Sequence, residues 1–187
     1  MTLVVKLVRV ACLLLLLQLT ACGFQLRGAF ELPAALSSVY IDSRSSTPLL
    51  QDLKLILKTN GSSVVDDATA ATSTIKIEKE ESLQRVISVD SSGRAREYEL
   101  SYKITFSVSA AINGEHQKVM IENKKLELIR DYVYDSEAVL GKSREKNILL
   151  RDMQRDASRL IMLQIQAAYR KNTATSTMKS NNTETKN

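Results

Sequence analysis

The sequence has 187 residues, with 26 Lys or Arg, 21 Asp or Glu, one His and two Cys, and its formal net charge is +5. A chain of this length suits one domain with a modest core. Its positive charge is mild and well short of the profile of a nucleic-acid-binding protein, so we expect no nucleic-acid partner.

Residues 1–21 have the features of a cleaved lipoprotein signal peptide. Lys6 and Arg9 precede a leucine-rich run at residues 10–19. The length of this run is about half of the roughly 20 residues that a membrane-spanning helix needs. The run leads into Leu19-Thr20-Ala21-Cys22, which is the bacterial lipobox pattern. We expect cleavage before Cys22. The alternative is an ordinary signal peptide followed by a cysteine that carries no lipid.

A lipidated Cys22 has consequences for anchoring and for chemistry. An S-diacylglycerol group and an N-acyl group on this cysteine supply the more than one chain that stable membrane anchoring requires. Gly23 follows where an Asp would favour the inner membrane, so we expect the outer membrane. Because Cys12 is lost with the leader, no thiol remains for a disulfide, a metal or a nucleophile. Cleavage also removes Lys6 and Arg9, leaving 24 basic and 21 acidic residues, or +3.

The first predicted elements are a short strand and a helix. Ser38-Val39-Tyr40-Ile41 is rich in β-formers and ends at Asp42. Thr47 and Pro48 form an N-cap followed by proline at the first helical position. Apolar residues then recur on one face until Asn60-Gly61, which predicts a helix over residues 48–60.

Three long strands are predicted next, over residues 74–90, 97–110 and 116–134. In the second of them every even-numbered residue is apolar and every odd-numbered residue is polar, which indicates one buried face. Ser92-Gly93 and Asn113-Gly114 provide the two turns. The apolar phase flips in the third strand, so we expect a bulge or bend near residues 122–125.

A second helix is predicted over residues 144–169, where apolar residues follow helical spacing. The order β-α-β-β-β-α predicts a single α+β domain over residues 22–170. We expect a four-stranded mixed sheet with two helices packed on one face and a polar opposite face. Residues 171–187 are mostly Thr, Ser, Asn and Lys, which predicts a disordered polar tail.

The residues do not favour an enzyme. The single histidine, His116, is next to a predicted hairpin turn, and no metal-ligand spacing or phosphate loop is present. Glu80 and Glu81 are adjacent on a predicted strand and point to opposite faces, so they cannot form a carboxylate pair. Asp66 and Asp67 fall in a loop. We predict no catalytic residue, no metal site and no cofactor apart from the lipid on Cys22.

Three stretches, in order along this frame, resemble the lipopolysaccharide-assembly lipoproteins of the LptE (RlpB) family. They are Cys22-Gly23-Phe24-Gln25-Leu26-Arg27-Gly28 followed by Leu32-Pro33, then Ser92-Gly93-Arg94-Ala95-Arg96-Glu97-Tyr98-Glu99-Leu100, and Arg130-Asp131-Tyr132-Val133-Tyr134-Asp135 continuing through Val139-Leu140 to Asp156. The similarity spans roughly residues 20–165. It implies an outer-membrane lipoprotein facing the periplasm, which plugs the LptD β-barrel and meets lipopolysaccharide during export.

Four basic residues are the candidates for lipopolysaccharide contact. Arg94 and Arg96 follow the first hairpin turn, and Lys142 and Arg144 precede the second predicted helix. Arg forms bidentate hydrogen bonds with phosphates and Lys acts as a point charge. Lys142 also matches a basic position of the family. The next candidates for contact with lipopolysaccharide are Arg151, Arg155 and Arg159.

Two alternative functions remain open. One is a lipoprotein that binds another envelope component such as peptidoglycan, and the other is a lipid-anchored enzyme.

Overall fold

The computed structural model describes residues 32–110, 118–133 and 139–184, and only the backbone is described over residues 139–144 and 173–184. Cys22 and His116 lie outside the described residues. Two short 3-10 helices, η1 (Ala34–Leu36) and η2 (Ala68–Ala70), accompany the main elements. These are β1 (Ser38–Ser43), α2 (Pro48–Thr59), β2 (Ser63–Val65), β3 (Ser73–Val89), β4 (Ala95–Ala110), β5 (Lys118–Val133) and α3 (Val139–Glu184).

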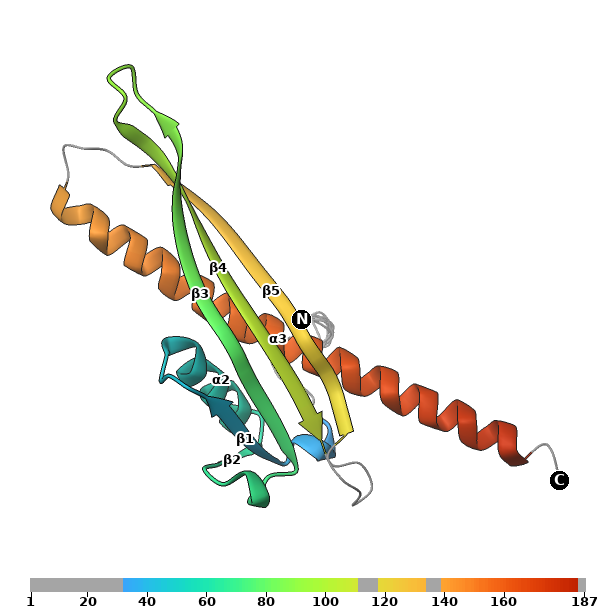
Figure 1. Ribbon diagram of the computed structural model, residues 1–187. Coiled ribbons are helices and arrows are strands. Elements are labelled where there is room, and N and C mark those ends of the chain that lie inside the picture. The colour runs from blue at the N-terminus through green and yellow to red at the C-terminus, as the bar shows by residue number, and fades with distance from the viewer. Residues whose placement is uncertain (1–31, 111–117, 134–138, 185–187) are drawn as a thin grey trace, which may run out of the picture.

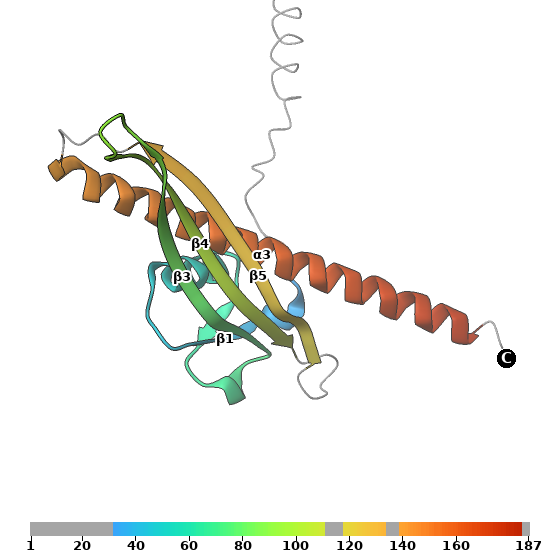
Figure 2. The ribbon, with the colours of Figure 1, turned by 45° about the horizontal axis from the view of Figure 1, so that its top comes forward.

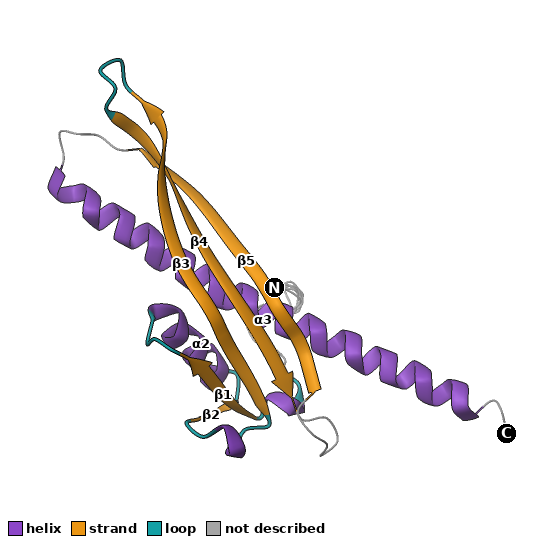
Figure 3. Cartoon of the chain, in the orientation of Figure 1, coloured by secondary structure: helices purple, strands orange, loops and turns teal. Residues whose placement is uncertain are grey.

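The strands form one mixed sheet in the order β2-β1-β3-β4-β5. β1 is parallel to both β2 and β3, whereas β3, β4 and β5 pair antiparallel. Both helices lie on the same face of the sheet (Figure 1, Figure 3). The predicted α+β class is confirmed, but the described residues contain five strands and not four. The additional strand, β2, is only three residues long, which is too short for an alternating pattern to reveal.

The alternation along β4 is confirmed from Leu100 to Ala110. The even-numbered residues of this stretch are all buried, whereas Lys103 on the opposite face is exposed. The buried row packs with apolar residues of α2 and α3, which include Leu53, Met153 and Ile161. Burial of this continuous layer is the main driving force that holds the helices on the sheet.

The bend predicted near residues 122–125 is present in β5. The pairing with β4 shifts between Phe106 opposite Lys124 and Val108 opposite Ile121, which leaves an irregularity around Asn123. Asn123 has a φ of 43°, a conformation that Asn tolerates better than most residues. Its N–H donates to the hydroxyl of Ser107 over 3.1 Å. The bulge therefore explains the phase flip in the sequence.

The last helix is longer than predicted at both ends. α3 begins at Val139 and ends at Glu184, so it includes Lys142 and Arg144 and continues through most of the segment predicted as a disordered tail. Adding residues to an existing helix avoids the cost of nucleation, so even a polar sequence can extend it. The composition of residues 171–184 concealed this extension, because Thr, Ser and Asn have modest helix propensity.

Candidate functional site

The β3–β4 hairpin ends in a turn that is organised by one carboxylate. Oδ1 of Asp90 accepts hydrogen bonds from the N–H and hydroxyl of Ser92, over 2.8 and 2.6 Å, and from the N–H of Arg94 over 3.0 Å. These bonds, the Ser92 hydroxyl first, hold the pKa of Asp90 below its ordinary value. Gly93 adopts a φ of 79°, which only glycine reaches without strain. The turn is therefore well defined.

The two candidate arginines of this hairpin have different surroundings. Nε of Arg94 donates to Oδ2 of Asp90 and to the hydroxyl of Ser92, both over 3.0 Å, although 68% of its side chain is exposed. Arg96 is exposed, and its side chain has no hydrogen bond or ion pair with any described residue. Arg94 therefore helps to hold the turn, and Arg96 is the freer cation of the two.

The remaining candidates, Lys142 and Arg144, lie in the first turns of α3 and not in a loop before it. Figures 1 and 2 show the start of α3 and the β3–β4 hairpin at the same end of the molecule. The structure thus brings the two sequence-predicted basic pairs to one end. The positions of their side chains relative to each other lie outside what the structure describes at residues 139–144.

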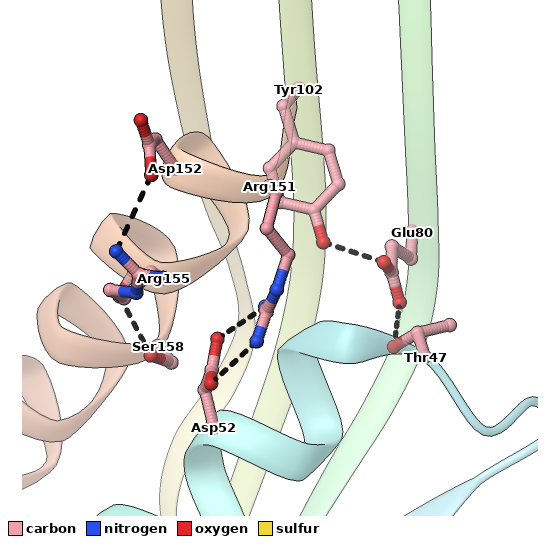
Figure 4. A network of polar contacts seen from close by, with 8 residues as sticks. All are labelled: Thr47, Asp52, Glu80, Tyr102, Arg151, Asp152, Arg155 and Ser158. Carbon is pink, nitrogen blue, oxygen red and sulfur yellow. Dashed lines mark hydrogen bonds and ion pairs between the residues drawn. The ribbon is translucent and has the colours of Figure 1, made fainter. Parts of the chain in front are cut away.

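The arginine row of α3 is partly engaged in ion pairs. Arg151 donates to both carboxylate oxygens of Asp52, over 2.6 and 2.9 Å, and so ties α3 to α2 (Figure 4). Arg155 lies 3.4 Å from Asp152 of its own helix. Arg159 has no contact of this kind with a described residue. Arg151 therefore has a structural role, which spacing within α3 alone could not reveal.

A buried tyrosine connects the sheet with the start of α2. The hydroxyl of Tyr102 donates to Oε1 of Glu80 over 2.6 Å, and Oε2 of Glu80 accepts from the hydroxyl of Thr47 over 2.9 Å (Figure 4). Thr47 is the N-cap residue of α2 and Pro48 follows it at the start of the helix, as predicted, but the Thr47 side chain makes no capping hydrogen bond and binds Glu80 instead. Glu81 faces the other way and pairs with Lys79, so the prediction that Glu80 and Glu81 point to opposite faces is confirmed.

Replacing Tyr102 with Phe should weaken the fold by about 1–2 kcal/mol at neutral pH, because Glu80 loses its buried donor. Burial, and then the bond to Glu80, raise the pKa of Tyr102, and burial also raises that of Tyr169. The folded chain therefore holds these protons more tightly than the unfolded chain. Stability should be full below the ordinary tyrosine pKa of about 10 and should fall as the pH rises above it.

Urea unfolding from pH 7 to 11 tests this expectation. The parent chain should lose stability above pH 10, and Tyr102→Phe should show a shallower alkaline slope, because Tyr169 alone then contributes. Equal slopes in the parent and the variant would contradict it.

The face of the sheet opposite the helices was predicted to be polar, but it combines paired charges with exposed apolar residues. Leu83 and Ile129, which are 60% and 51% exposed, lie on either side of Ser101 on this face. Lys103 pairs with Glu127 over 3.0 Å, and Lys79 pairs with Glu81 over 2.8 Å. Arg85 donates to both carboxylate oxygens of Glu99 over 2.7 and 2.8 Å. This open face can meet a polar surface without leaving unpaired charges. The described residues include no group of three or more potential metal ligands, and among them no helix is long and apolar enough to cross a membrane.

The comparison with protein families decides what kind of protein has this architecture. The family model "LptE: Lipopolysaccharide-assembly" matches residues 36–165, which extend from η1 through most of the buried part of α3. The chain belongs to the LptE family. The resemblance inferred from the sequence is therefore confirmed.

Individual relatives of this LptE-family chain agree with the match. The LPS-assembly lipoprotein LptE of Photorhabdus laumondii is 26% identical over 145 residues, which cover 77% of this chain and 76% of the relative. The solution NMR structure of lipoprotein B from Nitrosomonas europaea has a TM-score of 0.64 at 30% identity, covering 78% of this chain and 91% of that one. The crystal structure of rare lipoprotein B from Shewanella oneidensis has a TM-score of 0.59 at 26% identity, with coverages of 73% and 98%.

Proposed function

We propose that this protein is an outer-membrane lipoprotein, anchored through Cys22 and facing the periplasm, that takes part in lipopolysaccharide transport and assembly. The family match over residues 36–165 carries this proposal. The relative from Photorhabdus laumondii is itself named an LPS-assembly lipoprotein. The lipobox ending at Cys22 supplies the anchor. The proposed role is one of binding and assembly, without catalysis.

The proposed protein partner is the LptD β-barrel, inside which this chain would sit as a plug. The lumen of a large outer-membrane barrel is polar. The charged residues of the open sheet face suit this polar environment, because they pair with one another, as in Arg85–Glu99 and Lys103–Glu127. These ion pairs can be placed against a polar barrel wall without leaving any buried charge unpaired.

Lipopolysaccharide contact is proposed at the end of the molecule formed by the β3–β4 hairpin and the start of α3. Lipid A and its core sugars carry phosphates, which guanidinium and ammonium groups bind. Arg96 is the freest described cation of the hairpin. Lys142 and Arg144 add two basic positions at the same end (Figure 1).

Charge reversal at these residues should weaken binding of the soluble domain to purified lipopolysaccharide. Both Arg94→Glu/Arg96→Glu and Lys142→Glu should reduce affinity by about tenfold or more, equivalent to about 1.4 kcal/mol. Lys54→Glu, at an exposed position of α2, is the matched control and should bind as the parent does. Far-UV circular dichroism and urea midpoints check the folding of each variant. Parent-like binding by both test variants would move the contact elsewhere, with Arg159 next to be tested.

A further inference from the structure

The sheet has a long free edge on β3. β1 pairs with β3 only as far as Ser43 opposite Ile77, whereas β3 continues to Val89. From Lys79 onward, β4 is the sole neighbour of β3 among the described strands. The register with β4 is continuous from Lys79 to Val86, a stretch of eight residues, or about 26 Å. A strand of ordinary length, about 5–6 residues, fits along it.

The other long edge, on β5, carries features that discourage strand pairing. The first half of β5 has two register irregularities and the exposed residues Lys118, Lys124 and Lys125, whereas the irregularities of β3 lie on either side of the stretch from Lys79 to Val86. Bulges and lysines are the usual protection of sheet edges. Between Lys79 and Val86, β3 has no register irregularity, and its exposed basic residues are paired with carboxylates on the sheet. Lys79 pairs with Glu81, and Arg85 pairs with Glu99.

The free edge of β3 also borders a groove. A cavity of about 440 Å³ lies between the β1–α2 connection, β3 and α3, and its lining includes Arg44, Thr47, Lys79, Leu150 and Gln154. The first part of α3 projects past β3 in both ribbon views (Figure 1, Figure 2). An added strand would lie in line with β1, beside the cavity that Leu150 of α3 helps to line.

The surface itself restricts what can occupy this position. Every second residue of an edge strand directs its backbone N–H and C=O away from the sheet, and another extended backbone satisfies these groups in series. Val86 and Leu83 are 48% and 60% exposed on the two faces of the edge and would gain cover. Arg44 has no ion pair or hydrogen bond with a described residue, so the occupant would bring an acidic side chain to it.

We propose that the free edge of β3, from Lys79 to Val86, is a strand-addition site that receives an extended, partly apolar segment of the barrel partner with an acidic residue facing Arg44. This inference rests on the association with a barrel partner proposed above. It adds the mode of contact, because a sixth strand in the sheet would fix the orientation of this chain within the complex.

Hydrogen exchange with residue resolution, on the complex co-expressed with LptD and on the chain alone, tests the proposal. In the chain alone, alternate amides from Lys79 to Val86 should exchange rapidly. In the complex, the same alternate amides should slow by about a hundredfold or more, as hydrogen bonding to a new strand requires. The outward amides of β5 should change much less.

Two matched lysine substitutions add a second readout. Val86→Lys places a charge beside the proposed added strand and should weaken the complex by tenfold or more. Val119→Lys, the same change at a 57% exposed valine of β5, should weaken it less than threefold. Both variants should unfold at the urea concentration of the parent. A complex that forms without protection of β3, or that both variants weaken equally, would overturn strand addition and leave the proposed function standing. Failure of the parent to form a complex would overturn both.

Discussion

Replacing Phe106 with alanine should lower the free energy of unfolding by about 3–5 kcal/mol. Phe106 is 0% exposed in the middle of β4, with Ile77 and Lys124 as its strand neighbours, and it belongs to the core that packs the helices on the sheet. The loss combines the transfer of a large aromatic side chain with the cavity that it leaves. Urea unfolding of the unlipidated mature chain, followed by circular dichroism, measures it.

The control for Phe106→Ala lies on the other face of the same strand. Lys103→Ala removes an exposed ion pair with Glu127 and should change stability by no more than about 0.5 kcal/mol. Ser107→Ala is a poorer control, because the Ser107 hydroxyl accepts a hydrogen bond from Asn123 in the bulge of β5. Equal losses for Phe106→Ala and Lys103→Ala would show that the faces of β4 are assigned incorrectly.

Replacing Cys22 with alanine should abolish lipoprotein processing. The thiol of Cys22 is the only atom of the lipobox that can form the thioether to diacylglycerol, and the N-terminal amine that is acylated later is exposed only after cleavage. The variant should accumulate as a precursor, incorporate no labelled palmitate and lose its membrane anchor. Gel mobility and radiolabelled palmitate in whole cells give the measurement.

Cys12→Ala is the matched control for Cys22→Ala, because Cys12 lies within the leader that cleavage removes. It should be processed and labelled as the parent is. The fold itself should survive Cys22→Ala, since all the buried core residues of the described part of the chain lie at Leu36 or beyond. Normal palmitate labelling of Cys22→Ala would contradict the assignment of the anchor.

The parts of the fold that the sequence predicts are those with a long, regular pattern. The alternation on β4 and the helical spacing on α2 each extend over many residues, so a single interpretation fits. The bend of β5 was visible for the same reason, as a break in an otherwise regular phase. β2 was missed because three residues carry no period, and the ends of α3 were missed because their sequences show no regular apolar spacing.

The candidate site was less predictable, because its contacts join residues that are distant in the chain. Arg151 and Asp52 are separated by 99 residues, and nothing near either one indicates the other. Thr47 has the sequence context of an N-cap, yet its hydroxyl binds Glu80, 33 residues away. The free edge of β3 is likewise invisible in sequence, since it depends on where β1 leaves the sheet. Basic residues can be found from sequence, whereas their engagement in ion pairs depends on the tertiary structure.

Affinity capture of the tagged, lipidated chain from detergent-solubilised outer membrane tests the proposed role most directly. The captured material is analysed by mass spectrometry for protein and for glycolipid, and Cys22→Ala serves as the control for membrane delivery. We expect the parent chain to retain LptD in near-equal amount together with lipopolysaccharide. Recovery of the chain from the outer membrane with neither LptD nor lipopolysaccharide bound would contradict the proposed function.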